Sequence, residues 1–171
     1  TERGFQFFHG FLGTIMDGYY EHSHSGINYM RMNSQIIESK GHATDIFTQW
    51  AVDYLDERKG KEEPFFLMLS YNAPHVPIQP PLELFGEIRE REPQLNEDRA
   101  KLVALIEHLD KGIGRVVRAL QENRISRVGS DKDIKVEYLE HVNAFNLQRS
   151  TSDINITMLA GAIICGSTRL I

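Results

Sequence analysis

The chain has 171 residues, of which 41% are hydrophobic and 25% are charged, and its formal net charge is −5. This composition is typical of one globular domain and argues against a disordered chain, a collagen or a coiled coil. No block of like charge indicates nucleic-acid binding, no apolar run approaches the roughly 20 residues of a membrane span, and the single cysteine, Cys165, excludes an intrachain disulfide and a cysteine-based zinc site.

The start of the chain is rich in glycine and aromatic residues. It begins Thr1-Glu2-Arg3-Gly4, without a methionine and without the charged and then apolar segments of a signal peptide, so we expect a fragment or a processed chain. Frequent glycines break the periodicity, which predicts loops with short extended pieces. A strand or hairpin is expected within residues 28–37. The aromatic residues between positions 5 and 20 are expected to pack in a core rather than to line a pocket.

An apolar stripe at helical spacing predicts the first helix. Its members are Ile46, Phe47, Trp50, Ala51, Tyr54 and Leu55. Thr44 is expected to be the N-cap, and Asp45 suits the positive end of the helix dipole in the first turn. The polar run 56–63 is expected to end this helix.

A strand and a loop are expected next. The apolar run 65–71 shows no alternation, which predicts a strand buried on both faces in a parallel sheet. A charge introduced at Leu67 is therefore expected to unfold the chain. Four prolines within residues 74–81 remove amide donors, so this segment is expected to be a loop.

The second helix has the longest periodic pattern in the chain. Apolar residues keep a spacing of three and four from Leu102 to Leu120, Asn96 is the expected N-cap, and Asn123 is the expected end. After Ile125 the pattern weakens. The order helix, strand, loop, helix predicts an α/β fold, in which ligands bind at the carboxyl ends of the strands.

Four ordered stretches are similar to a known family. Residues 64–77 read PFFLMLSYNAPHVP and resemble the PFFLYLSYNAPHTP segment of the sulfatases, in the alkaline-phosphatase-like superfamily. Residues 3–13, 41–48 and 106–116 resemble further sulfatase stretches in the same order. The resemblance implies a partial alkaline-phosphatase-like sandwich, a mostly parallel sheet flanked by helices and incomplete at both ends. Residues 1–125 would be the central part of the catalytic domain, and residues 126–171 a divergent tail of unknown structure.

The resemblance also implies a function. The chain would be a fragment of a sulfuric ester hydrolase, and His75 would contact the sulfate ester, neutralising its charge or protonating the leaving alcohol. The alternative for His75 is a structural imidazole between prolines. The substrate would be a sulfate ester of a small molecule or a carbohydrate. Family members are often exported, but the compartment of this chain stays open.

Several functional parts of the family do not occur in this sequence. Sulfatases use calcium and a formylglycine nucleophile, and the two aspartates, the Cys-x-Pro/Ala-x-Arg motif and the Lys-His motif that supply them would precede residue 3. The later SDNG motif is also absent, since the chain has Ser130-Asp131-Lys132-Asp133. We therefore expect the isolated chain to be inactive. A phosphoric or phosphonic ester hydrolase fragment of the same superfamily and a non-catalytic pseudoenzyme or binding module remain alternatives.

Other residues are weaker candidates. His22 and His24 form a His-x-His pair, with His9 and His42 near in sequence, but surface loop histidines are the favoured interpretation. Asp45 and Asp110 are better explained as a first-turn residue and an exposed helix carboxylate. Cys165 and Arg169 have the spacing of the nucleophile motif, but Ser167 replaces its Pro or Ala, so a buried small hydrophobic residue is favoured for Cys165.

Overall fold

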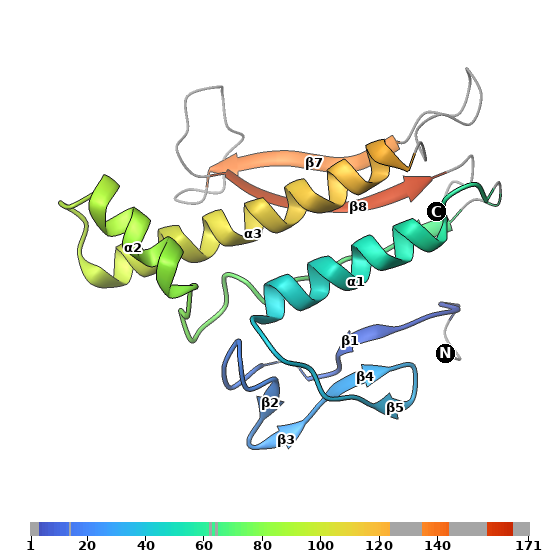
Figure 1. Ribbon diagram of the computed structural model, residues 1–171, viewed down its shortest axis with the longest axis horizontal. Helices are drawn as coiled ribbons and strands as arrows, with labels where there is room; N and C mark the ends of the chain where they lie inside the picture. Colours follow the sequence, from blue (N-terminus) through green and yellow to red (C-terminus); the bar gives the residue numbers. More distant parts are fainter. Residues whose placement is uncertain are drawn as a thin grey trace. The chain divides into compact units, whose positions relative to one another are not determined.

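The structure is a computed structural model of residues 1–171, and it describes residues 4–13, 15–61, 63, 65–123, 135–143 and 157–165 (Figure 1). The chain divides into two compact units. The first comprises residues 1–50 and 71–109, and the second comprises residues 51–70 and 110–171.

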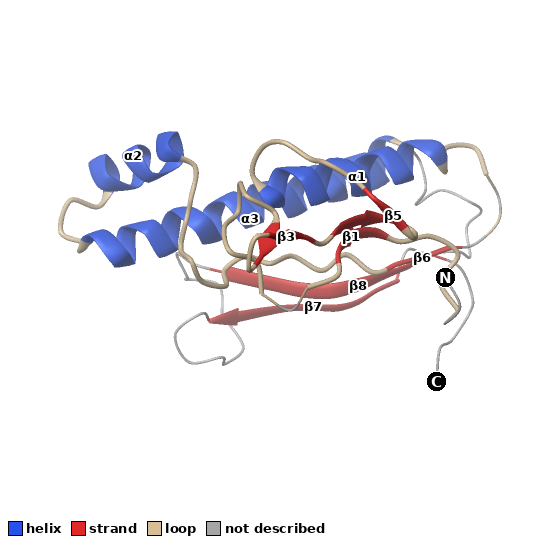
Figure 2. Ribbon diagram, turned by 90° about the horizontal axis from the view of Figure 1, so that it is seen from below, coloured by secondary structure: helices blue, strands red, loops and turns tan. Residues whose placement is uncertain are grey.

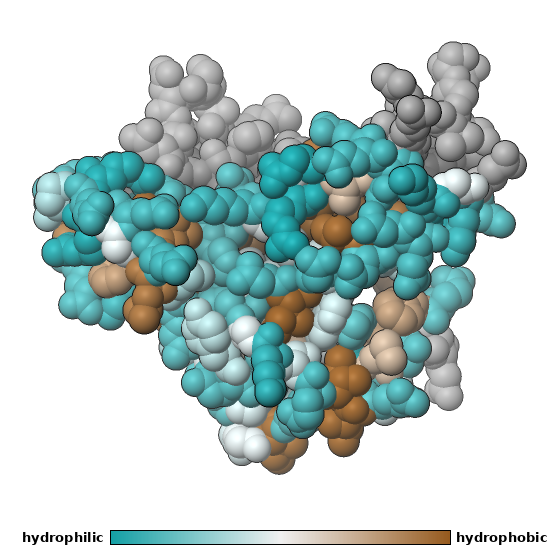
Figure 3. Space-filling view, in the orientation of Figure 1, coloured by the Kyte–Doolittle hydropathy of each residue, from teal (hydrophilic) through white to brown (hydrophobic). Residues whose placement is uncertain are grey.

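Short antiparallel strands form the sheets of the first unit (Figure 1). The order β1-β4-β5 makes one sheet and β2-β3 a second, with bounds β1 His9–Phe11, β2 Ser23–His24, β3 Ile27–Asn28, β4 Met30–Met32 and β5 Gln35–Ile36. The β4–β5 pair confirms the hairpin expected within residues 28–37. Apolar side chains reach the surface around these strands (Figure 3), among them Ile27 and Ile36.

A carboxylate shapes the β2–β3 hairpin. Ser25 and Gly26 both have positive φ, as the two central residues of a type I′ turn require. The side chain of Asp17 accepts hydrogen bonds from the amides of Ser25 at 2.9 Å and Gly26 at 3.0 Å, and from the hydroxyl of Ser23 at 2.9 Å. These bonds, led by the one from Gly26, lower the pKa of Asp17 because they favour its charged form.

Three helices lie in the described residues: α1 (Ala43–Glu57), α2 (Leu82–Arg91) and α3 (Glu97–Glu122). None of them is long and apolar enough to cross a membrane. The expected ends of α3 are confirmed, since Asn96 Oδ1 accepts from the amide of Arg99 at 2.9 Å and the amide of Asn123 donates to Ala119 O at 3.0 Å. Helix α2 is not indicated by the sequence pattern, although it buries Leu84 and Ile88 one turn apart.

The expected N-cap of α1 is wrong. The helix begins at Ala43, so Thr44 lies inside its first turn. The residue before the helix is His42, and its Nδ1 accepts a hydrogen bond from the amide of Thr44 at 3.2 Å. An imidazole therefore provides the acceptor that a serine, threonine or aspartate usually supplies.

The core of the second unit joins the two long helices. Ala51 and Leu55 of α1 are buried against three residues of α3, which are Val116, Ala119 and Leu120. Half-buried Phe65 and Leu67 of β6 (Phe65–Leu67) pack on this cluster. In Figure 2 these helices lie on one side of the strands of the second unit.

The sheet of the second unit differs from the expected parallel sheet. Its order is β6-β8-β7, with β7 at Lys135–Asn143 and β8 at Thr157–Cys165, and both pairings are antiparallel. The strand expected over 65–71 spans only 65–67, and Met68 is 62% exposed. An apolar run is buried on both faces only where other elements cover both. Here β6 has one neighbour, β8, among the described strands, so the expectation of a fully buried strand is wrong.

Leu55→Ala tests the core of the second unit. Leu55 is fully buried, so the loss of its side chain leaves a cavity and should lower the free energy of unfolding by about 2–5 kcal/mol. Urea unfolding followed by circular dichroism measures this loss. The matched control is Leu82→Ala, because Leu82 is 84% exposed and should change stability by less than about 0.5 kcal/mol. Equal losses in the two variants would contradict the packing.

Candidate functional site

His75 lies on the loop that connects β6 to α2. Its side chain is exposed, and its amide donates a hydrogen bond to Asn72 O at 2.8 Å, which closes a turn. The ring nitrogen Nδ1 is 2.7 Å from the carbonyl oxygen of Val76. A carbonyl can only accept, so Nδ1 carries a proton, and the neutral imidazole keeps its lone pair on Nε2. The structure thus places His75 at the surface of its loop rather than in a packed core.

Two buried side chains hold this loop. The hydroxyl of Tyr19 donates to the carbonyl of His75 at 2.9 Å, and the amide of Tyr19 donates to Gln79 Oε1 at 2.8 Å. The Nε2 atom of His42 bonds to the carbonyl of Gln79 at 2.9 Å. Tyr19 and His42 are each 2% exposed, and their rings stack at 4.8 Å. The loop backbone is therefore fixed at two carbonyls, one on each side of Pro77.

The two partners of His42 assign its protonation state. Nε2 faces a carbonyl, which accepts, and Nδ1 faces the amide of Thr44, which donates. The ring is therefore the neutral tautomer with its proton on Nε2. Burial disfavours the charged ring and lowers the pKa of His42 to about 4, although the bond to Gln79 opposes this change.

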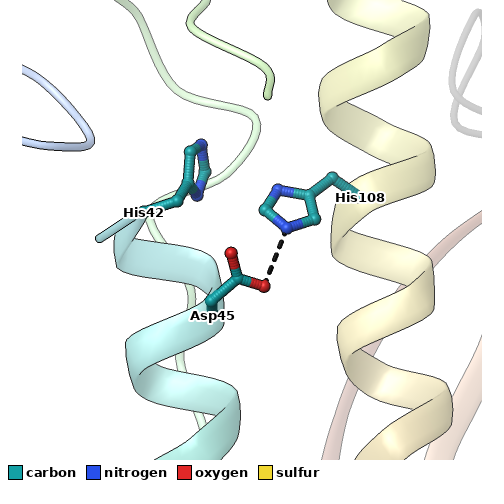
Figure 4. A group of neighbouring side chains, drawn as sticks. All are labelled: His42, Asp45 and His108. Carbon is teal, nitrogen blue, oxygen red and sulfur yellow. Dashed lines mark hydrogen bonds and ion pairs between the residues drawn. The ribbon is translucent and has the colours of Figure 1, made fainter. Parts of the chain in front are cut away.

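His42 belongs to a cluster with Asp45 and His108 (Figure 4). Nε2 of His108 is 2.9 Å from Asp45 Oδ1, and the rings of His42 and His108 meet edge to face at 4.5 Å. Both imidazoles are buried, whereas the side chain of Asp45 is 54% exposed. Nδ1 of His108 is buried and makes no hydrogen bond. The cluster therefore links the first turn of α1 to the middle of α3.

The cluster does not fit calcium. His42, Asp45 and His108 each offer one ligand atom, and these three atoms lie within 4.8 Å of one another. Calcium takes six to eight oxygen ligands, whereas this set offers a single carboxylate. A transition metal would accept the imidazoles, yet both nitrogens of His42 already have backbone partners. We therefore assign the cluster a structural role, in which His108 holds Asp45.

The histidines singled out in the sequence do not converge. His22 is 4% exposed and bonds to the carbonyl of Gly41 at 2.8 Å, so its interpretation as a surface histidine is wrong. His24 lies 4.0 Å from Asp17, and His9 stacks on Trp50 with ring centroids 3.4 Å apart. In the described part of the chain, the triad of Figure 4 is the only such group of three potential ligands.

The remaining sequence candidates have mixed outcomes. Asp110 is exposed on α3, as expected. Asp45 lies in the first turn of α1, as expected, and it also pairs with His108. Tyr19 packs in the core, whereas Phe5 and Phe7 are each 45% exposed. Cys165 ends β8, and its side chain lies outside the described residues, as does the rest of its motif.

The sequence analysis missed Tyr19, Gln79 and His108 as parts of the site. A signal existed for His108, since it lies on the apolar face of α3 beside Leu105 and Leu109. A buried imidazole on such a face needs a hydrogen-bond partner, but the sequence does not name the partner. No comparable pattern marks Gln79, because its role depends on contacts across the loop.

Comparisons with known proteins identify a family for most of the chain. A family model described as Sulfatase matches residues 1–128. The uncharacterized sulfatase YdeN of Escherichia coli is 29% identical over 123 residues, 71% of this chain and 20% of that protein. The crystal structure of Ps i-CgsB covers 71% of this chain and 30% of its own, with a TM-score of 0.60 and 28% identity, and a second structure shows it in complex with k-i-k-neocarrahexaose.

A second class of protein also matches. The bifunctional pantoate ligase/cytidylate kinase of Prochlorococcus marinus strain MIT 9301 is 40% identical over 84 residues, 47% of this chain and 16% of that protein. That of strain AS9601 is 55% identical over 42 residues, 25% of this chain and 8% of that protein. The chain thus spans at most about a fifth of the curated relatives named here.

The pKa of His42 predicts a pH dependence of stability. It is about 4 in the folded chain against an ordinary value of 6.5, so between these values the unfolded chain binds more protons. Stability is then fully present above pH 6.5 and falls as the pH drops toward 4, by roughly 3 kcal/mol for this group. Urea unfolding between pH 4 and 8 measures the change. His42→Asn removes the titration and should flatten the profile by that amount, and an unchanged profile would contradict it.

Proposed function

Because the chain belongs to the sulfatase family, we propose that residues 1–125 are the central part of the catalytic domain of a sulfuric ester hydrolase. In this proposal the loop around His75 forms one wall of the sulfate pocket. The observation that carries it is an exposed imidazole on a loop whose backbone is fixed by buried donors. A group held in place before the substrate arrives avoids the entropic cost of positioning during the reaction.

His75 has the chemistry that this role requires. With Nδ1–H bound to the carbonyl of Val76, Nε2 is the nitrogen that exchanges a proton with a ligand. The protonated ring donates Nε2–H to a sulfate oxygen and neutralises charge, or gives its proton to the leaving alcohol. The first of these actions stabilises charge that grows in the transition state.

The parent protein would supply the remaining parts. We propose that the calcium ligands and the formylglycine nucleophile of the family lie outside these 171 residues, since the described residues offer no fit for calcium. Membership of the sulfatase family supports an alkaline-phosphatase-like sandwich in the parent, and the likeness to Ps i-CgsB supports a mixed fold of helices and sheet. The complex of that protein with a hexaose supports a carbohydrate sulfate ester as the substrate class.

We propose a different origin for the tail. The sulfatase match ends at residue 128, which leaves 43 residues (171 − 128 = 43). The 42-residue match to pantoate ligase/cytidylate kinase has the length of this tail, although the 84-residue match must also reach into the sulfatase part. Residues 129–171 would then be a pantoate-ligase-like segment joined to the sulfatase segment.

The coding sequence around the chain tests both origins. We expect the codons before Thr1 to encode a Cys-x-Pro/Ala-x-Arg motif and those after Ile171 to continue as a pantoate ligase. Sequencing the genomic locus in single long reads measures this. A sulfatase SDNG motif after Ile171 would contradict the assignment of the tail, and a start codon directly before Thr1 would favour a pseudoenzyme.

The isolated chain should not turn over an aryl sulfate such as 4-nitrophenyl sulfate when calcium is present. The reason is the missing nucleophile motif and acidic ligands, and release of 4-nitrophenol is the measurement. Cys165→Ala is the control variant. Hydrolysis by the chain that this substitution abolishes would overturn the proposal and make Cys165 the nucleophile.

His75→Ala in the parent protein tests the proposed role. Loss of a positioned proton donor or anion contact should lower turnover about 10²–10⁴-fold, while the melting temperature stays nearly unchanged because His75 is exposed. The matched control is His24→Ala, another partly exposed histidine, which should leave turnover unchanged. Full activity of the His75 variant, or a lowered melting temperature with little loss of turnover, would contradict the role.

A further inference from the structure

One imidazole connects the start of α1 to the loop that carries His75. Nδ1 of His42 accepts from the amide of Thr44 in the first turn, and Nε2–H donates to the carbonyl of Gln79, four residues after His75. A helix start leaves its first amides without partners inside the helix. His42 therefore satisfies one amide and one carbonyl that belong to different segments.

The loop depends on donors from outside because of its composition. Pro74, Pro77, Pro80 and Pro81 have no N–H group and cannot bond the loop to itself at those positions. The carbonyls of His75 and Gln79 instead accept hydrogen bonds from Tyr19 and His42. Both donors are buried, so water cannot readily replace a hydrogen bond that is lost. A carbonyl left unpaired there would disfavour the observed conformation of the loop.

We propose that His42 is a positioning residue for His75. His42 acts through the hydrogen bond from its Nε2 to the carbonyl of Gln79, while its Nδ1 caps α1. Tyr19 assists it, since its ring stacks on the imidazole and its amide holds the side chain of the same glutamine. The ring of His108 also meets this imidazole edge to face, with ring centroids 4.5 Å apart. The positioning role of His42 rests on the proposed function of His75. The hydrogen bonds of His42 are observed in the structure independently of that function.

Two substitutions separate the two roles of the ring. His42→Asn places an amide oxygen near the position of Nδ1, so it keeps the cap and removes the donor to Gln79. His42→Gln places an amide nitrogen near the position of Nε2, so it keeps that donor and removes the cap. Both are neutral and polar, which makes each variant the control of the other.

Hydrogen exchange of the full chain measures the effect. In His42→Asn we expect the amide of His75, which bonds to Asn72 O, to exchange about tenfold faster or more, with little change at Thr44. In His42→Gln we expect the reverse. Equal acceleration at both places in both variants, or no change at the loop in His42→Asn, would overturn the proposal. Tyr19→Phe removes only the hydroxyl donor and should also speed exchange at His75, even where both His42 variants fold poorly.

Kinetic measurements on the parent sulfatase distinguish the positioning role of His42 from the proposed role of His75 in the reaction. His42→Asn should lower kcat more than it changes KM, His42→Gln should restore kcat, and His42→Asn combined with His75→Ala should be no slower than His75→Ala alone. If His75→Ala retains full activity, the proposed function fails while the exchange results still decide the loop contact. If His75→Ala is slow but His42→Asn is not, the positioning role fails alone.

Discussion

The hydrogen bond from the buried ring of His42 to the carbonyl of Gln79 joins the start of α1 to the proline-rich loop of the first unit. A proline-rich loop cannot form a ladder of its own, so its shape is set by donors from other segments. The same ring meets the amide of Thr44 with its second nitrogen. Because each nitrogen has a partner of fixed polarity, only the neutral imidazole satisfies both, and burial keeps it neutral.

The pair of His108 and Asp45 extends this contact to α3. It brings an imidazole and a carboxylate beside His42 in the way a metal site would, but the partners of His42 oppose that interpretation. A cluster of ligand-type residues is therefore not a metal centre when both ring nitrogens of one member already have backbone partners. The half-exposed Asp45 and the buried His108 instead tie the first turn of α1 to a neighbouring helix.

The second unit shows how far a family resemblance reaches. Its helical core is compact around Leu55 and Leu120, as the periodic patterns indicate. Its sheet is different, since β6 pairs antiparallel with β8, from the part of the chain after the sulfatase match. Whether a strand pairs parallel or antiparallel depends on the partner strand that is present. The sulfatase-like sequence of β6 therefore does not by itself determine a parallel sheet.

The sequence by itself determined the two long helices, the end of α3 at Asn123, the loop of prolines and the sulfatase family, because these features depend on local spacing, caps, backbone chemistry and residue order. It also marked His75, whose role remains a prediction. Only the tertiary structure decided that His42 caps α1, that Asp45 meets His108, and that β6 is short and pairs antiparallel with β8. The physical reason is that each of these outcomes joins segments distant in sequence, and a hydrogen-bond donor or a strand edge carries no local signal of the partner that satisfies it.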